Sequence, residues 1–276
     1  MVEENAVAFA CEGAWLYGVI SVPQAAGERG VLVVVGGPQY RVGSHRQFTL
    51  LARSLAQQGI SCMRFDYRGM GDSEGKMRPF DSVDADLRAA IDQFFKTAPS
   101  LKSVVLWGLC DGAAAAVFYA SKDERISGLA LLNPWVRTDG GVAKATLKHY
   151  YPRRLLDPGL WEKILHGRFD YSAATSSAWR LLRTALIAAP ELPGSLPDRM
   201  YAGLSRYRGK VLIVLSGADL TAQEFSALAA GSDKWQRMLA APGVKVERLA
   251  GADHTCSRRV WLDQVAHWTT EWIGSW

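Results

Sequence analysis

The chain has 276 residues, of which 49% are hydrophobic and 21% are charged, and its net charge is +5. This composition indicates a globular protein with a full core, and the mild basic excess excludes a typical nucleic-acid-binding protein. The four cysteines are widely spaced, which argues against a zinc ribbon or a redox pair and indicates free thiols. Because the sequence shows neither a signal peptide nor an apolar run that could cross a membrane, we expect a cytoplasmic protein.

Strand and helix patterns alternate along the first half of the chain. The predicted strands lie at residues 6–11, 16–22, 31–35, 60–65, 103–108 and 126–132. The predicted helices between them lie at 48–57 and 82–96, the second with Asp81 or Ser82 as its N-cap. Such alternation is typical of an α/β fold, so we predict a mostly parallel central sheet with helices on both faces.

The alternation stops between residues 134 and 208 and then resumes, with strands at 210–216 and 244–249 and helices at 222–240 and 258–272. We predict a helical cap at 134–208, inserted into a core made of 1–133 and 209–276. The cap carries 12 lysines and arginines against 6 acidic residues. This excess is consistent with an anionic substrate, with peripheral contact to an acidic membrane surface, or with a plain solvated helical surface.

The rest of the chain is organised around residues 103–116, where a buried strand leads through Gly-x-Cys-x-Gly into an alanine-rich helix. This is the pattern of a nucleophile elbow, in which a sharp turn between strand and helix presents a nucleophile. Here the nucleophile would be Cys110, and the positive end of the helix would stabilise its thiolate. The alternative is a buried cysteine that only packs at a turn.

An acid and a histidine follow in the order that such a site requires, since Asp219 and His254 each come directly after a predicted strand. The carboxyl ends of neighbouring parallel strands meet at one edge of a sheet, so we expect Cys110, Asp219 and His254 to converge. His254 would take the cysteine proton, and Asp219 would orient the imidazole. The alternatives are a surface histidine, or orientation by Asp253, which is disfavoured because adjacent side chains diverge.

Two backbone N–H groups are needed to stabilise an oxyanion on the attacked carbonyl. We expect one from Asp111 and the other from Gly37, with Gln39 as the fallback because Pro38 has no N–H. The side chain of Asp111 is interpreted as a carboxylate at a helix N-terminus. Gln39 and His45 are further candidates for substrate contact, because they lie in or beside the same loop.

With these features in place, the chain resembles the α/β-hydrolase superfamily over nearly its whole length. Residues 36–48, 65–73 and 108–112 are similar to the exosortase A system-associated hydrolase, type 1, a bacterial group encoded beside exopolysaccharide and protein-sorting machinery. The resemblance implies a hydrolase-type enzyme. Cys110 departs from the serine hydrolases, and Val-Gly-Gly at 35–37 departs from their usual His-Gly loop. A cysteine at this place also occurs in dienelactone hydrolases and polyhydroxyalkanoate synthases, which act on activated esters or thioesters.

The sequence therefore predicts a hydrolase that acts on a small ester or thioester through an acyl-cysteine. An acyltransferase to a saccharide or lipid hydroxyl and a non-catalytic binding protein of the same fold are the alternatives. No phosphate-cradling glycine pattern and no ligand-spaced metal cluster is present, so we expect no cofactor, no metal and no nucleic-acid partner.

Overall fold

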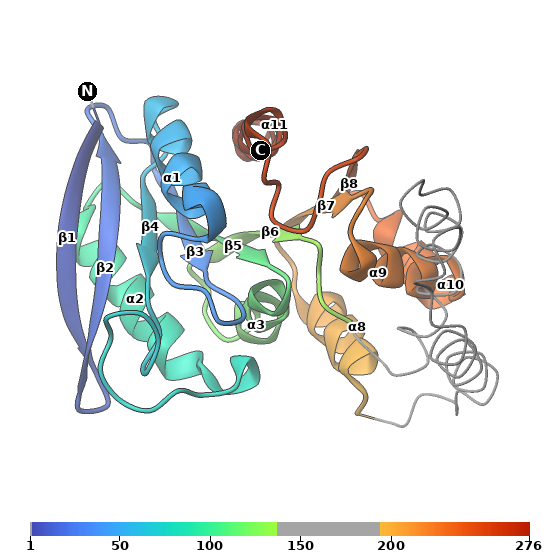
Figure 1. Cartoon of the computed structure of the whole chain (residues 1–276), viewed down its shortest axis with the longest axis horizontal. Coiled ribbons are helices and arrows are strands. Elements are labelled where there is room, and N and C mark those ends of the chain that lie inside the picture. Colours follow the sequence, from blue (N-terminus) through green and yellow to red (C-terminus); the bar gives the residue numbers. More distant parts are fainter. Residues whose placement is uncertain (1, 137–193) are drawn as a thin grey trace, which may run out of the picture.

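The computed structural model describes residues 2–136 and 194–276, and within them one sheet of eight strands forms the centre. The strands run across the sheet in the order β1-β2-β4-β3-β5-β6-β7-β8 (Figure 1). Their bounds are β1 Val2–Cys11, β2 Ala14–Pro23, β3 Arg29–Val34, β4 Cys62–Phe65, β5 Ser103–Leu109, β6 Ile126–Leu132, β7 Lys210–Ser216 and β8 Val244–Leu249. All pairs from β4 to β8 are parallel, whereas β2 pairs antiparallel with β1 and β4. The predicted mostly parallel sheet is confirmed.

Helices cover both faces of this sheet. In Figure 1, α1 and α11 lie on one side of the central strands, and α2, α3 and α8 lie on the other. The helices are α1 Gln47–Gln57, α2 Asp84–Thr97, α3 Asp111–Ala120, α8 Leu196–Arg206, α9 Leu220–Ala230, α10 Asp233–Leu239 and α11 Arg259–Gly274, and the short 3-10 helices are η1 Ser44–Arg46 and η2 Phe80–Ser82. The layered α/β architecture thus agrees with the prediction.

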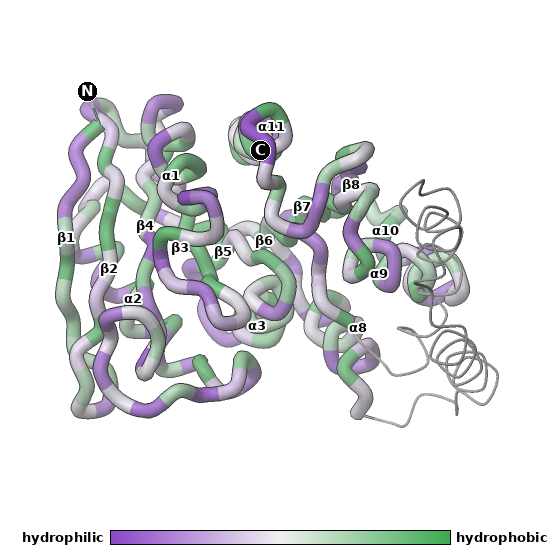
Figure 2. The backbone as a smooth tube through the Cα atoms, in the orientation of Figure 1, coloured by the Kyte–Doolittle hydropathy of each residue, from purple (hydrophilic) through white to green (hydrophobic). Residues whose placement is uncertain are grey.

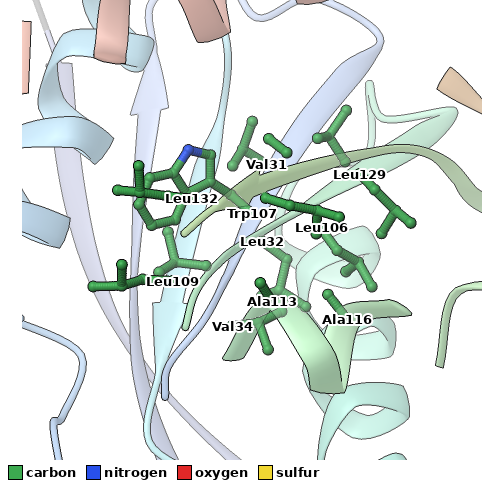
Figure 3. Packing of buried hydrophobic residues seen from close by; sticks show 14 of the residues in the cluster. Val31, Leu32, Val34, Leu106, Trp107, Leu109, Ala113, Ala116, Leu129 and Leu132 are labelled. Carbon is green, nitrogen blue, oxygen red and sulfur yellow. The ribbon is translucent and has the colours of Figure 1, made fainter. Parts of the chain in front are cut away.

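The core lies along the central strands β3, β5 and β6, whose residues are mostly buried, and Figure 2 colours the backbone of the chain by hydropathy. Val31, Leu32 and Val34 are fully buried, which explains why this run lacks a polar alternation. On one face Trp107 packs edge-on against Phe48 of α1, with ring centroids 5.9 Å apart. Figure 3 shows the small side chains of α3 against the strands, so the helix lies close to the sheet.

Several predicted boundaries were wrong, among them the start of the first strand, which lies at Val2 and not at residue 6. Helix α2 begins at Asp84 with Val83 as its N-cap, not with Asp81 or Ser82, because those residues belong to the separate turn η2. The helix predicted at 222–240 is two helices, α9 and α10, and they are separated by Gly231 and Ser232. The strand predicted at 60–65 begins only at Cys62.

The predicted cap lies largely outside the described residues, since 137–193 are not among them. The described end of that range contains α8, which packs against α3. The division into core and cap stays a prediction. Among the residues that are described, no helix is long and apolar enough to cross a membrane.

The turn from β5 to α3 depends on two glycines. A Cβ at Gly108 would lie 2.6 Å from the backbone nitrogen of Ala113, and one at Gly112 would lie 2.4 Å from the carbonyl oxygen of Val34. Both distances are far below van der Waals contact. The first turn of α3 therefore sits directly on the backbone of β3 and β5, and this approach requires residues without a side chain.

We expect Gly112→Ala to lower the free energy of unfolding by about 1–3 kcal/mol or more, because neither packed backbone can yield to the new methyl group. Urea denaturation measures this change. Gly274→Ala is the matched control, since a Cβ there would meet nothing within 4 Å. A Gly112→Ala protein as stable as wild type would contradict the close packing described here.

Candidate active site

Cys110 lies between β5 and α3 in a backbone conformation that few non-glycine residues adopt, with φ 58° and ψ −121°. Hydrogen bonds on both sides hold it there. Its N–H donates to the carbonyl of Leu132 at the end of β6 (3.0 Å), and its carbonyl accepts from the N–H of Trp135 (3.2 Å). Strain of this kind persists only where the surroundings impose it, and it is frequent at functional sites. The side chain of Cys110 is half-buried.

The other three cysteines are buried. Burial raises the pKa of Cys62 to about 12, and burial raises that of Cys256 to about 11 although a hydrogen bond with Ser216 opposes it. Burial also raises the pKa of Cys11. Raised pKa values keep these thiols protonated, and buried thiols are inert. Cys110 is therefore the cysteine that is partly exposed to solvent and also lies at the N-terminus of a helix.

Asp219 follows β7 and has two functions in the fold. It is the N-cap of α9, where its carboxylate accepts hydrogen bonds from the N–H groups of Thr221 (3.3 Å) and Ala222 (3.1 Å). The same carboxylate lies 3.0 Å from Nδ1 of His254, and the residue is only 7% exposed. The cap fixes the carboxylate, so its direction toward the imidazole is set by the start of the helix.

His254 lies in the loop after β8, between Asp219 and Cys110. A hydrogen bond with Asp219 and a second with Cys110 raise the pKa of His254 from 6.5 to about 10, while burial works against them. Because Nδ1 faces Asp219, the other ring nitrogen is left for the sulfur of Cys110. The structure thus brings the three predicted side chains together, although they are far apart in the sequence.

Asn133, which sequence reasoning missed, braces this arrangement from the end of β6. It is fully buried with φ 49°. Its Oδ1 accepts from the N–H of Ser216 (2.8 Å), and its Nδ2 donates to the hydroxyl of Ser216 (3.0 Å) and to the carbonyl of His254 (3.1 Å). One amide therefore joins β6, the end of β7 and the histidine loop. An asparagine directly after a buried strand was the available signal, because a buried amide must find partners.

One of the predicted oxyanion donors, the N–H of Gly37, is already bound by a side chain. The N–H of Gly37 donates to Oδ2 of Asp111 (2.9 Å), and the N–H of Gly112 donates to Oδ1 (3.1 Å). Burial raises the pKa of Asp111, although backbone hydrogen bonds from Gly37, from Asp111 itself and from Gly112 lower it. The Asp111 side chain thus bridges to another loop, which goes beyond the predicted carboxylate at a helix N-terminus.

The two predicted substrate contacts are less central. Oε1 of Gln39 accepts from Nε2 of Gln47 in α1 (3.2 Å), so its amide is directed to that helix. His45 is exposed in η1 with φ 54°. In the described residues no hydrogen bond joins either side chain to Cys110, Asp219 or His254. Their contact with substrate stays a prediction.

Sequence reasoning also missed how the Gly37 loop is anchored. The backbone N–H of Arg41 donates to Oδ1 of the fully buried Asp66 (2.6 Å), and its guanidinium pairs with Asp66 and Asp72. A second buried pair, Arg68 with Asp86 at 2.7 Å, ties the loop after β4 to α2. Buried ion pairs with several hydrogen bonds fix geometry. The loop that carries Gly37 is therefore anchored through Arg41 to the buried Asp66.

We expect Asn133→Ala to lower the free energy of unfolding by about 2–3 kcal/mol, because the N–H of Ser216 and the carbonyl of His254 lose a buried partner. Chemical denaturation measures the loss. Asn133→Gly removes the same brace but tolerates the positive φ, so it should be the less destabilised of the two variants. Wild-type stability in both variants would refute the bracing role.

Comparison with known proteins agrees with this architecture. The sequence profile of the family described as "Serine aminopeptidase, S33" matches residues 27–178. A polyketide transferase of a Penicillium species, grgF, is 27% identical over 42% of this chain and 40% of its own length. The quorum-quenching protein AidA of Acinetobacter baumannii is 29% identical over 43% of this chain and 40% of its own length. The matched part therefore spans less than half of either relative.

A structural relative covers far more of the chain. An esterase from Pyrococcus furiosus superimposes with a TM-score of 0.66 over 100% of this chain and 92% of that chain, at 16% identity. At this identity the likeness concerns the fold. Profile, sheet order and elbow together lead to one assignment: the chain belongs to the serine aminopeptidase S33 family of the α/β-hydrolase superfamily.

Proposed function

We propose that this protein hydrolyses an ester or thioester through an acyl-cysteine, with Cys110 as nucleophile, His254 as proton carrier and Asp219 as its orienting carboxylate. The observation that carries the proposal is the position of the His254 imidazole, which hydrogen-bonds Asp219 on one side and Cys110 on the other. A histidine whose pKa is raised to about 10 in this way holds its proton at neutral pH. In the proposed reaction the attacking group is the Cys110 thiolate, formed when His254 takes the thiol proton.

In the first half of the reaction the Cys110 thiolate attacks the carbonyl carbon. A C–S bond forms, and the π electrons of the carbonyl move onto its oxygen, which the N–H groups of Gly37 and Asp111 would stabilise. When the carbonyl re-forms, the bond to the leaving group breaks. His254 gives its proton to the departing alkoxide or thiolate.

In the second half His254 takes a proton from water while the hydroxide attacks the acyl carbon. The C–S bond then breaks, the carboxylic acid leaves, and the thiolate and the imidazolium are restored. A thiolate is a good leaving group as well as a good nucleophile. It would be expelled from an amide adduct faster than the amine, so activated esters and thioesters are the favoured substrates.

The finer subtype is also a proposal. Residues 65–73 and 108–112 resemble the exosortase A system-associated hydrolases, type 1, which would place the reaction in exopolysaccharide-related metabolism. A cytoplasmic location and a cap that favours anionic substrates or a membrane surface belong to the same proposal. The cap part depends on residues 134–208, most of which lie outside the described residues.

The second candidate is acyl transfer to a hydroxyl. It is favoured by the names of two sequence relatives, the polyketide transferases grgF and claH of Penicillium. The acyl-cysteine would be the same, and an alcohol would replace water in the second half. Product analysis by mass spectrometry with and without an added sugar or fatty alcohol separates the two, because only a transferase yields the new ester as main product.

We expect intact-protein mass spectrometry to find one acyl adduct on the wild-type chain after incubation with aryl esters and acyl thioesters. Cys110→Ala should form none and should lose turnover, because the nucleophile is gone. Cys11→Ala is the matched control, since that thiol is buried on β1, and it should keep the adduct. Turnover by Cys110→Ala at the wild-type rate would refute the proposed nucleophile, and no adduct with any donor would favour a binding protein.

Asp219→Asn separates the proposed catalytic role of Asp219 from its role as the N-cap of α9. Asparagine caps a helix as well as aspartate does, so α9 should still form, but the unfolding midpoint at neutral pH should fall because the imidazolium of His254 loses its charged partner. The charge that orients and stabilises the imidazolium is lost, and kcat should fall by about 10²–10⁴-fold. The measurement is kcat over a pH series together with thermal unfolding. Wild-type kcat in Asp219→Asn would contradict the assigned function.

The same variant, Asp219→Asn, tests how kcat/KM depends on pH. The pKa of His254 is raised from 6.5 to about 10 in the folded protein. The raised pKa means that the imidazolium stabilises the fold fully below about pH 6.5, and that this contribution disappears as the pH rises through about 10. The alkaline limb of kcat/KM should move to lower pH in Asp219→Asn, because the larger cause of the shift is removed.

A further inference from the structure

The Asp111 carboxylate lies where an oxyanion would be expected. Its two oxygens accept from the N–H groups of Gly37 (2.9 Å) and Gly112 (3.1 Å), and the N–H of Asp111 itself also contributes. Gly37 and Asp111 are the two donors proposed for the oxyanion. The carboxyl group of Asp111 therefore already binds the N–H of Gly37, one of those two donors.

The carboxyl group of Asp111 can lie this close to the loop after β3 because Gly36 in that loop has no side chain. A Cβ at Gly36 would lie 2.2 Å from Oδ1 of Asp111, and Gly37 adopts φ +58°. A carboxylate in the first turn of a helix ordinarily binds N–H groups of its own helix. Here Oδ2 instead crosses to another loop. Helix capping alone does not account for that bond, so the contact calls for a second explanation.

We infer that the Asp111 carboxylate is an internal competitor for the oxyanion site, which the carbonyl of an acyl donor must displace before Cys110 can be acylated. The inference rests on the proposed function, since it concerns the same N–H groups. An ionised acceptor binds N–H groups more strongly than a neutral carbonyl does. Release of Asp111 would therefore limit acylation of the resting protein.

The inference includes a new partner for the displaced carboxylate, the hydroxyl of Tyr67. Its hydroxyl is buried and has no hydrogen-bond partner among the described residues. Burial and then the charge of Asp111 raise the pKa of Tyr67 well above its usual value, so the hydroxyl keeps its proton in the field of that carboxylate. The ring is fixed edge-on against Phe65, with centroids 5.2 Å apart. A buried hydroxyl without a hydrogen-bond partner lowers stability, and a role in the displaced state of Asp111 would explain why it is there.

Two substitutions of Asp111 test the inference. Asparagine has no charge and replaces one of the two carboxylate oxygens by an NH2 group, which cannot accept from the N–H that this oxygen bound. Alanine removes the competitor altogether. We expect both variants to acylate Cys110 about tenfold faster than wild type with an aryl ester, measured by rapid-quench mass spectrometry.

Alkylation of Cys110 by iodoacetamide is the internal control, because this reaction uses the same thiolate but forms no oxyanion. Its rate should be unchanged in both variants. Asp84→Asn is the matched variant. It removes one carboxylate from the first turn of α2, where Asp84 pairs with Lys122, a residue just beyond the far end of α3 from Asp111. This variant should acylate at the wild-type rate.

Tyr67→Phe tests the second position of the carboxylate. In the wild-type background it should slow acylation several-fold, because the displaced carboxylate loses its partner. In the Asp111→Ala background it should have no effect, and this difference is the coupling between the two residues. Loss of a buried hydroxyl without a partner should not reduce stability, so unfolding does not confuse the result.

The outcomes are distinct. Unchanged or slower acylation in Asp111→Asn and Asp111→Ala, with a wild-type protein that is acylated, overturns the inference and leaves the proposed function intact. Acylation and alkylation accelerated equally also overturn it, because the carboxylate then acts on the thiol. A wild-type protein that no acyl donor modifies overturns the proposed function, and the inference with it.

Discussion

The close contact between the first turn of α3 and the backbone of β3 is the constraint on which the site depends. With Gly112 against the carbonyl of Val34, the chain must turn within one residue after β5. That residue is Cys110, and its unusual φ follows from the turn. The same contact brings α3 beside the loop after β3, so Asp111 can reach Gly37. One steric requirement thus positions the proposed nucleophile and both proposed oxyanion donors.

The opposite side of the site is held by polar contacts that also serve the fold. Asp219 caps α9 and pairs with His254, so the helix start and the imidazole share one carboxylate. Asn133 connects Ser216 with the carbonyl of His254 across two strand ends. Asp219, Asn133 and Ser216 are buried, and each needs its partners to be tolerated there. The geometry of the proposed relay is therefore maintained by the same bonds that stabilise the carboxyl edge of the sheet.

The alternation of strands and helices could be predicted because the central strands are apolar on both faces and the helices follow a clear period. The convergence of Cys110, Asp219 and His254 could be expected from strand ends that meet at one edge. The start of α2 could not be predicted, because Asp81 and Ser82 are good N-cap residues but belong to the separate turn η2. The hydrogen bond from the N–H of Gly37 to Asp111 could not be predicted either. It depends on the lack of a side chain at Gly36 and on the rotamer of Asp111, and a sequence pattern gives no information on a rotamer.

An anion-binding nest that is built before substrate arrives has a consequence of its own. Preorganised N–H groups stabilise an oxyanion because they need no rearrangement during the reaction. A donor of this kind is costly without a partner where it is buried, which applies to the N–H of Gly112 but not to that of the exposed Gly37. The carboxyl group of Asp111, one residue after the proposed nucleophile, accepts from the N–H groups of Gly37 and Gly112 in the free chain. Stability of the free protein and readiness of the proposed oxyanion site are then in direct competition, and the strength of the Asp111 contact sets the balance between them.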